Sequence, residues 1–315
     1  MTYDLGVIGG GVAIQMARRA LGAYGRIAIT YLEDTRNSYP EFDFVGSVDA
    51  LLDRRVVDAV YIATPVATHV QLVRRALEAG LPVLLEKPIS VDLADARSLG
   101  SLDTSRIAVA FRKRYSAVAE AVKATRQAYP DDPCELHFTW LAPHPGEGHW
   151  KTGGRATGGG VCLDIGSHVL DLVEYCLGEV QELRAYEVRV DQVTGSDEYI
   201  RLNLAICGGS EAVVDIGWAT GDPLQIITFA HRETSIAWIK DALSPNSLLY
   251  VVMGSQASRT VCRRQHEYDR MLHDFRSFTS GRGEIIADWA AGMRNMELIS
   301  RILDRRESSS PAPAD

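Results

Sequence analysis

The sequence predicts an α/β chain that begins with a doubly wound parallel sheet and continues as an α+β domain with an open, mainly antiparallel sheet. Two observations predict this fold class. Between Leu5 and Leu85, short apolar runs alternate with segments of helical periodicity, an order typical of parallel strands joined by right-handed crossovers. After residue 130, strand-like runs follow one another, and several alternate apolar and polar side chains. One face of the second sheet should therefore meet water or another subunit.

The predicted elements of the first part are strand 5–8, helix 12–21, strand 27–31, helix 48–52, strand 59–63, helix 69–79 and strand 83–85. Gly80 follows the last of these helices as a C-terminal stop. Residues 35–44 include Pro40 and leave no room for an amphipathic helix, so we expect a loop there. The second part is predicted to hold helix 116–128 and strands 135–141, 182–190, 199–206, 211–218, 224–230, 234–239 and 247–252.

A glycine-rich turn joins the first strand to the first helix. Gly9 can make the tight turn, and Gly11 lets a pyrophosphate approach the backbone N–H groups where the helix begins at Val12. Ile14 stands where such turns usually carry a third glycine or alanine, so the helix should pack less closely on the strand. The turn indicates a Rossmann dinucleotide-binding domain, and a plain tight turn is the alternative.

The residues after the second strand bear on the choice of cofactor. An acidic residue about 20 positions after the glycine turn commonly binds the ribose hydroxyls of NAD, and Glu33 and Asp34 stand there. Arg36 suits the 2′-phosphate of NADP instead. The acidic pair would repel that phosphate, so NAD is slightly favoured over NADP. Alternatively, either Glu33 or Asp34 is a solvated loop residue with no cofactor contact.

Two later strands of the parallel sheet end in polar turns. One ends in Thr64-Pro65, with His69 four residues beyond the proline, and the other ends in Glu86-Lys87-Pro88. Open α/β sheets bind ligands at the carboxyl ends of their strands. Lys87 is therefore either a solvated cap or a charge delivered to a site. For His69, the alternative is a histidine at a helix start with no ligand role.

A second motif lies beyond the parallel sheet. Three glycines, residues 158–160, precede Asp164 and His168, which are separated by four residues and so share one face of a helix. The apolar stripe of the same helix is formed by Val161, Ile165, Val169 and Leu172. The alternative for His168 is a histidine with its hydrogen bonds satisfied in the core.

With these motifs the chain resembles the glucose-fructose oxidoreductase, inositol dehydrogenase and MocA family of oxidoreductases. The resemblance covers nearly the whole chain, including residues 272–275 and a helix at 287–303. It implies that the Thr64-Pro65 and Glu86-Lys87-Pro88 turns line the nicotinamide half of the cofactor site. It also implies that Lys87, Asp164 and His168 match the catalytic lysine, aspartate and histidine of the family.

Chemistry suggests roles for these three residues. Oxidation of a secondary alcohol transfers hydride to the nicotinamide and needs a base for the hydroxyl proton. An imidazole with an ordinary pKa of ~6.5 suits that base, which favours His168. Asp164 can hold the ring or bind a neighbouring hydroxyl. Lys87 can stabilise the developing alkoxide, or carry the proton itself if burial lowers its pKa. The sequence leaves this division open.

Four further residues are candidates for substrate binding. Arg112 and Arg114 lie in the run 110–115, where the family closes its sixth strand, and the resemblance matches Arg114 to a family arginine. Arg112 stands where the family commonly has a small polar residue, which indicates an anionic substrate or a basic surface turn. Trp150 and Arg155 lie in the glycine-rich segment 143–157, which resembles the family's substrate-covering loop. An indole suits a sugar or cyclitol ring face, and a merely mobile loop is the alternative.

Composition restricts the class of protein. With 315 residues and 46% hydrophobic content the chain suits two domains, which we expect at 1–115 and 116–304, with a disordered tail at 305–315. A net charge of -8 argues against nucleic acid binding. The sequence has neither a membrane-length apolar stretch nor a leader, so we expect a cytoplasmic protein that is neither exported nor membrane-bound. Five scattered cysteines suggest thiols rather than disulfides or a metal site.

We therefore expect an NAD(P)-dependent dehydrogenase or reductase. Its substrate would be a small molecule, with hydride passing between nicotinamide and a secondary alcohol or ketone of a sugar, amino sugar or cyclitol. Reduction of an imine or a tetrapyrrole is an alternative within the family. A non-catalytic dinucleotide-binding regulator and an NAD-using glycosidase are further alternatives. The resemblance also implies a homodimer or homotetramer formed through the second sheet.

Overall fold

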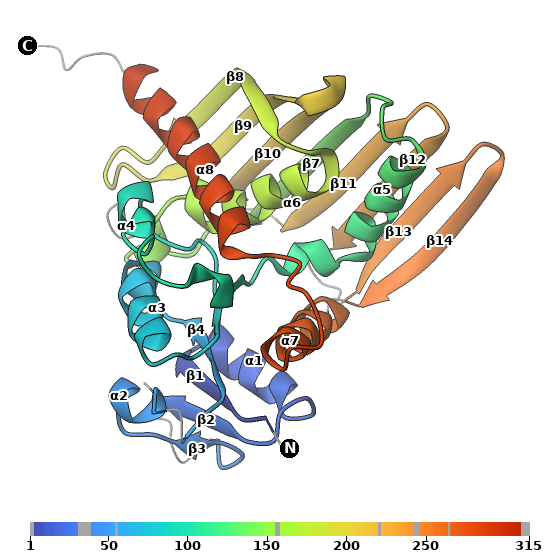
Figure 1. Cartoon of the computed structure of the whole chain (residues 1–315). Coiled ribbons are helices and arrows are strands. Elements are labelled where there is room, and N and C mark those ends of the chain that lie inside the picture. The colour runs from blue at the N-terminus through green and yellow to red at the C-terminus, as the bar shows by residue number, and fades with distance from the viewer. Residues whose placement is uncertain are drawn as a thin grey trace, which may run out of the picture. The chain divides into compact units, whose positions relative to one another are not determined.

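The computed structural model divides the chain into two compact units (Figure 1). The first comprises Met1–Arg112 and Gln265–Arg294, and the second comprises Lys113–Arg264 and Asn295–Asp315. The structure describes residues 3–30, 39–53, 56–154, 158–219, 222–241, 246–263 and 265–309. The domain limits at 115 and 116 stay predictions. The structure adds the return of residues 265–294 to the first unit, which no local sequence pattern indicated.

The first unit contains a six-stranded parallel sheet with the order β3-β2-β1-β4-β5-β6. Its strands are β1 (Leu5–Gly9), β2 (Ile27–Thr30), β3 (Asp43–Phe44), β4 (Ala59–Ala63), β5 (Val83–Leu85) and β6 (Ile107–Val109). The strand order reverses at β1, which pairs with both β2 and β4. The predicted doubly wound sheet is confirmed. The short edge strand β3 was not predicted, because two residues carry no periodicity.

The helical elements of the first unit are α1 (Val12–Ala20), α2 (Val48–Leu51), η2 (Val66–Thr68), α3 (His69–Glu78), α4 (Leu93–Arg97), η3 (Thr104–Arg106) and α7 (Gln265–Thr279). The returning helix α7 packs against α1 and buries Met271, Leu272 and Phe275. Tyr24 donates its hydroxyl to the carbonyl of Leu272 at 3.2 Å. Burial raises the pKa of this Tyr24 hydroxyl. The returning segment is therefore part of the core of the first unit.

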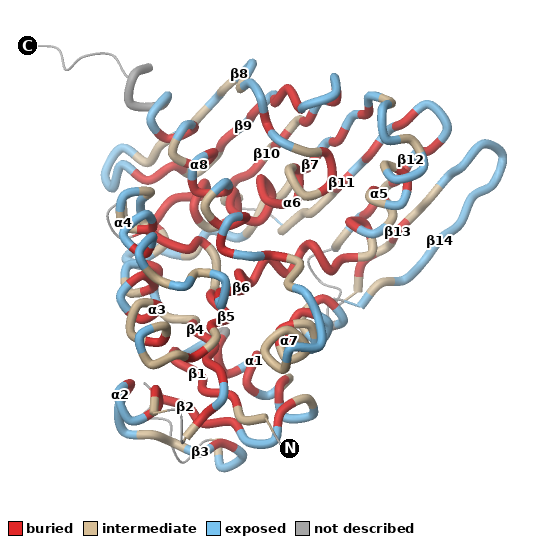
Figure 2. Tube along the Cα trace, in the orientation of Figure 1, coloured by how far each residue is buried: buried red, intermediate tan, exposed pale blue. Residues whose placement is uncertain are grey.

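The central strands of the first sheet are buried on both faces (Figure 2). Val7, Ile8 and Tyr61 are wholly inaccessible to solvent. Parallel strands covered on both faces read as continuous apolar runs, and the sequence signal was correspondingly clear. The functional groups of this unit consequently lie in the turns at the carboxyl ends of the strands.

The second unit contains an eight-stranded sheet with the order β14-β13-β12-β11-β7-β10-β9-β8. Its strands are β7 (Glu135–Pro143), β8 (Val180–Val190), β9 (Asp197–Ile206), β10 (Glu211–Ala219), β11 (Leu224–His231), β12 (Thr234–Asp241), β13 (Asn246–Met253) and β14 (Gln256–Arg263). β7 and β10 pair in parallel, and the other neighbours are antiparallel. The predicted mainly antiparallel sheet is confirmed. The edge strand β14 was not predicted, because it is largely exposed and lacks apolar alternation.

The helical elements of the second unit are α5 (Ala117–Ala128), η5 (Trp150–Thr152), the π-helical turn η7 (Cys162–Gly166), α6 (Ser167–Leu177) and η8 (Cys207–Gly209). Two elements have residues in both units: η4 (Arg112–Tyr115) and α8 (Trp289–Ser309). α8 runs to Ser309. The expectation of a disordered tail is therefore wrong for residues 305–309. The remainder of the expected tail lies outside the described residues.

The two faces of the second sheet differ. α5 packs on β12 and β13 and contacts α6 on the same face. Along β9, Leu202 and Leu204 are buried, whereas Arg201 and Asn203 are exposed. This alternation fits a sheet with one covered face and one polar face. Nowhere in the described residues is there a helix long and apolar enough to span a membrane.

We expect Gly9→Ala to lower the free energy of unfolding by at least about 2 kcal/mol. Gly9 has a φ of +134°, and a Cβ there would lie 2.3 Å from the carbonyl oxygen of Ala63. Urea unfolding measures the loss. Gly22→Ala is the matched control, because a Cβ at Gly22 meets nothing within 4 Å. Equal stability of the two variants would show that β1 and β4 do not need this close approach.

Candidate active site

The glycine turn of the first unit fits a phosphate group. Gly11 forms the N-cap of α1 with a φ of +52°, and a Cβ there would meet nothing within 4 Å. No described side chain caps this helix start. Open space beside uncapped N-terminal amides is an anion-binding arrangement. The turn therefore fits the pyrophosphate of a dinucleotide. Three residues predicted to select the cofactor, Glu33, Asp34 and Arg36, lie outside the described residues, as does the side chain of Val12.

His69 connects the two polar turns at the ends of β4 and β5. Its Nε2 lies 3.0 Å from the carbonyl oxygen of Thr64, and its Nδ1 lies 2.9 Å from that of Pro88. The residue is 1% exposed, and burial lowers the pKa of the imidazole from 6.5 to about 4. A neutral imidazole donates one hydrogen bond. Only one of the two carbonyls can therefore accept a hydrogen bond from the neutral ring, and His69 lies packed between the Thr64-Pro65 turn and the Glu86-Lys87-Pro88 turn, a position that the sequence did not assign.

Glu86 is held by the strand beside it. Tyr61 on β4 donates its hydroxyl to Oε1 of Glu86 at 2.5 Å. Burial, together with the charge of Glu86, raises the pKa of this Tyr61 hydroxyl well above its ordinary value. Lys87 follows Glu86 at the carboxyl end of β5. The first unit therefore places the candidate catalytic lysine directly after a fixed carboxylate.

Arg112 pairs with a carboxylate from the returning helix. Its Nη1 lies 2.6 Å from Oε2 of Glu267, and both side chains are almost fully buried, at 6% and 8% exposure. Its guanidinium also lies over the ring of Tyr268, 5.2 Å from the centroid. Burial acts to lower the pKa of Arg112, but the charge and hydrogen bond of Glu267 together with Tyr268 and Glu86 outweigh it, and the pKa is raised. These contacts anchor α7, and they give no support to the prediction that Arg112 binds substrate.

Arg114 makes a similar pair within the second unit. Its Nε and Nη2 donate to the carboxylate of Asp171 on α6, the shortest contact being 2.6 Å. The side chains are 8% and 2% exposed. The Arg114 guanidinium also lies 4.7 Å from the ring centroid of Tyr175. This pair anchors α6 three residues after His168, and Arg114 is not an exposed cation, so its contacts give no support to the prediction that it binds substrate.

Asp164 and His168 lie at the junction of the π-helical turn η7 and α6. Asp164 accepts from Nζ of Lys151, at 2.8 Å to Oδ1 and 2.9 Å to Oδ2. The imidazole of His168 stacks on the indole of Trp140, with centroids 5.7 Å apart and planes 15° apart. π-helical turns are rare and often occur at functional sites. The second unit therefore brings a carboxylate, an imidazole, an ammonium and an indole together.

Trp140 and Lys113 lie near the candidate residue His168 in a way that the sequence did not reveal: Trp140 contacts its imidazole, and Lys113 contacts Trp140. Trp140 lies on β7, where its alternation with Phe138 reads as ordinary core. The ammonium of Lys113 lies 4.5 Å from the ring centroid of Trp238 and 5.7 Å from that of Trp140. Lys113 is 2% exposed although it is a lysine. Only the fold brings Trp140 against His168 and Lys113 against Trp140, so no local signal could have identified them.

The segment predicted to cover the substrate is described only in part. Trp150 begins η5 and is 42% exposed, with its ring 5.7 Å from that of His149. Arg155 lies outside the described residues. The indole nearest His168 is thus that of Trp140, and Trp150 instead lies 5.7 Å from Nζ of Lys151.

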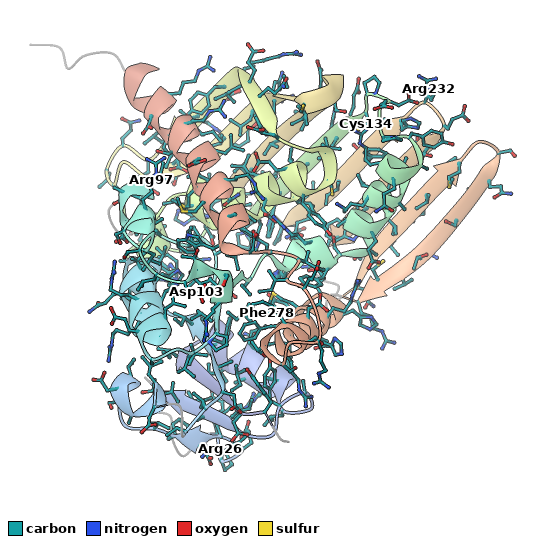
Figure 3. All side chains as sticks on the ribbon, viewed as in Figure 1. Arg26, Arg97, Asp103, Cys134, Arg232 and Phe278 are labelled. Carbon is teal, nitrogen blue, oxygen red and sulfur yellow. The ribbon has the colours of Figure 1, made fainter. Side chains whose placement is uncertain are left out.

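A cavity of about 410 Å³ in the first unit lies away from these groups. It is lined by residues at the amino ends of strands, among them Tyr3, Asp58 and Arg106, and by Phe278 of α7, which Figure 3 labels. The amino ends of parallel strands lie opposite the edge that binds ligands. We therefore do not assign this cavity to the candidate site. No described group of three metal-ligating side chains could hold a metal ion.

The strand order, the glycine turn and the polar strand ends define a Rossmann-type dinucleotide-binding protein. Residues 5–110 match the model of the oxidoreductase family with an NAD-binding Rossmann fold, GFO_IDH_MocA. Residues 132–235 match the C-terminal domain of the same family. The chain belongs to the glucose-fructose oxidoreductase, inositol dehydrogenase and MocA family, as the sequence motifs predicted.

Individual relatives agree with this assignment. The chain is 32% identical over 201 residues to dTDP-3,4-didehydro-2,6-dideoxy-alpha-D-glucose 3-reductase of Streptomyces violaceoruber, covering 62% of this chain and 54% of the relative. The match spans about half the length of such curated relatives.

Two solved structures share the fold. An oxidoreductase from Agrobacterium radiobacter in complex with NAD+, L-tartaric acid and magnesium has a TM-score of 0.83 at 19% identity, covering 98% of each chain. KijD10, a 3-ketoreductase from Actinomadura kijaniata in complex with NADP and TDP-benzene, has a TM-score of 0.79 at 20% identity, covering 96% of this chain and 98% of that one. At these identities the likeness shows the fold alone.

We expect Arg112→Met and Glu267→Met each to lower the free energy of unfolding by about 3 kcal/mol or more, because each leaves one buried charge unpaired. The double variant should lose less than either single one. Urea unfolding of all three proteins measures this. Arg18→Met is the control, because the Arg18–Glu41 pair is 54% and 31% exposed and should contribute less than about 1 kcal/mol. Additive losses in the double variant would contradict the pairing.

The low pKa of His69 predicts a loss of stability in acid. Its folded-state pKa of about 4 lies below 6.5, so the unfolded chain takes up this proton first as the pH falls. The contribution is complete above pH 6.5 and is lost as the pH falls towards 4, by up to about 3 kcal/mol. Urea unfolding at several pH values should show a shallower decline for His69→Gln than for the wild type. Identical declines would contradict the prediction.

Proposed function

We propose that the protein is an NAD(P)-dependent oxidoreductase that transfers hydride between nicotinamide and a secondary alcohol or ketone of a sugar, amino sugar or cyclitol. The observation that carries this proposal is the placement of Asp164 and His168 at one helix junction, with Lys151 against the carboxylate and Trp140 against the imidazole. Membership of an oxidoreductase family supports it. The name of the Streptomyces relative, a sugar 3-reductase, supports the substrate class.

The first unit would hold the cofactor. Gly9 and Gly11 would admit the pyrophosphate beside Val12, and the Thr64-Pro65 and Glu86-Lys87-Pro88 turns would line the nicotinamide. His69 would act by joining these turns rather than by touching the cofactor. We favour NAD over NADP on the acidic pair Glu33 and Asp34, with Arg36 as the opposing indication.

The residues of the second unit would handle the proton. When bound, the nicotinamide accepts or donates hydride at its C4 atom. His168 would take the hydroxyl proton of an alcohol, or return it to a ketone. Asp164 would orient a substrate hydroxyl, and Lys87 of the first unit would stabilise negative charge on the reacting oxygen. Trp140 would support the imidazole from β7.

The proposal also covers the assembly of the protein and its location in the cell. We propose a cytoplasmic homodimer or homotetramer that associates through the polar face of the eight-stranded sheet formed by β7 to β14. The alternating exposure along β9 supports a face that meets water or a second subunit. The negative net charge of -8 is consistent with a small-molecule enzyme rather than a nucleic acid-binding protein.

The purified protein should change the fluorescence of NADH or NADPH on binding. It should also produce NADH or NADPH when supplied with the oxidised cofactor and a panel of sugars, amino sugars and cyclitols. If the protein changed the fluorescence of neither NADH nor NADPH, the assignment of a nicotinamide cofactor would be wrong. Sugar release without net cofactor reduction would identify a glycosidase instead. Cofactor binding without turnover of any substrate would favour a regulator.

We expect Lys87→Ala to lower kcat on the order of 10²–10³-fold, because the variant loses a donor to the reacting oxygen. Lys87→Ala should still bind NADH, and its effect on NADH fluorescence should match that of the wild type. Lys87→Arg, which keeps the charge, should retain more activity than Lys87→Ala. Undiminished kcat in Lys87→Ala would show that the strand-end lysine is a solvated cap.

A further inference from the structure

Lys151, which is not one of the predicted catalytic residues, contacts the carboxylate of Asp164. Nζ of Lys151 contacts both oxygens of Asp164, at 2.8 and 2.9 Å. We propose that Lys151 and Asp164 together bind one uncharged hydroxyl group of the substrate, on the carbon next to the reacting one. This inference rests on the proposed function and narrows its substrate to a ring that carries such a neighbouring hydroxyl.

The backbone on both sides of Lys151 is fixed by the three-glycine segment. The carbonyl of Lys151 accepts from the N–H of Gly160 at 2.8 Å. A Cβ at Gly159 would lie 1.7 Å from the carbonyl oxygen of Gly153, so only glycine permits this approach. The N–H of Lys151 donates to Nδ1 of His149 at 3.2 Å. Lys151 is therefore held against Asp164 by its chain as well as by its charge.

The Lys151–Asp164 pair can exchange a contact with a ligand because it is not fully buried. The two side chains are 31% and 16% exposed. An ammonium carries three N–H donors, and the contacts with Asp164 use at most two. A carboxylate has about four acceptor sites. One hydroxyl can thus accept from Lys151 and donate to Asp164 at the same time.

Charge favours a neutral ligand at this position. The Lys151 ammonium is already balanced by the Asp164 carboxylate, and an anionic group placed there would face that carboxylate. Arg112, which had suggested an anionic substrate, is paired with Glu267, and Arg114 is paired with Asp171. A hydroxyl offers both a donor and an acceptor without net charge, so it suits the pair best.

The position of His168 indicates which substrate hydroxyl the Lys151–Asp164 pair binds. His168 lies four residues after Asp164, at the start of α6, so the two side chains emerge on one face. If His168 exchanges a proton with the reacting oxygen, a hydroxyl on Asp164 belongs to a neighbouring carbon. The Lys151–Asp164 pair therefore distinguishes a vicinal diol, or a ketone beside a hydroxyl, from its deoxy analogue.

The test measures binding of D-glucose, myo-inositol and the single-deoxy analogues of each to cofactor-loaded protein by titration calorimetry. In the wild type, at least one deoxy analogue should bind about tenfold or more weakly than its parent, because the charged hydrogen bonds to that hydroxyl are lost. In Lys151→Met the parent should weaken to within about threefold of the same analogue. Lys151→Arg should keep most of the wild-type discrimination.

Lys123→Met is the matched control. Lys123 also lies over an aromatic ring, 4.2 Å from the centroid of Tyr175, and it donates to the carbonyl of that residue. This variant should discriminate as the wild type does. Undiminished discrimination in Lys151→Met, or failure of both parent compounds to bind the wild type, overturns the inference. Binding with full discrimination but no NADH or NADPH production would instead remove the proposed hydride transfer and leave the inference standing.

Discussion

Each unit depends on a close approach of two backbone segments that only glycine permits. In the first unit, Gly9 at the end of β1 meets the carbonyl of Ala63 at the end of β4. In the second, Gly159 meets the carbonyl of Gly153. A side chain at either position would push the segments apart by more than packing tolerates. The first contact lies just before α1 begins at Val12, and the second lies beside Lys151, whose carbonyl accepts from the N–H of Gly160. Both candidate functional regions therefore adjoin a position where a Cβ atom would not fit.

Much of the fold could be predicted because its signals are local. The strands β1, β2, β4, β5 and β7 to β13 were anticipated, and so was the order that gives the doubly wound sheet, whereas the three-residue buried strand β6 was not among the predicted elements. The exceptions have physical reasons: β3 has two residues and β14 is exposed, so neither carries the alternation that burial imposes. The sequence did not predict that α8 continues to Ser309, because polar serines are as compatible with a helix end as with a disordered tail.

The candidate site could be predicted only where its residues form motifs. Lys87 ends a strand and Asp164 precedes His168 by four residues, and both facts can be read from the chain. The pairing of Arg112 with Glu267 joins residues 155 positions apart. Its two members look like surface charges until the returning helix α7 is placed. Trp140 likewise reads as core, because a strand pattern says which face a side chain takes but not what it meets there.

Burial separates ion pairs that hold the structure from the one that can serve a ligand. The Arg112–Glu267 and Arg114–Asp171 pairs are at most 8% exposed, and water or substrate entering them would have to displace packed side chains. The cost of desolvating such charges is repaid only by excellent geometry within the pair, so breaking them is strongly unfavourable. The Lys151–Asp164 pair is 31% and 16% exposed. Its charges remain partly solvated, and we propose that a substrate hydroxyl binds there. Pairs of opposite charge therefore fix elements in two places, whereas the third pair is exposed enough to contact a ligand.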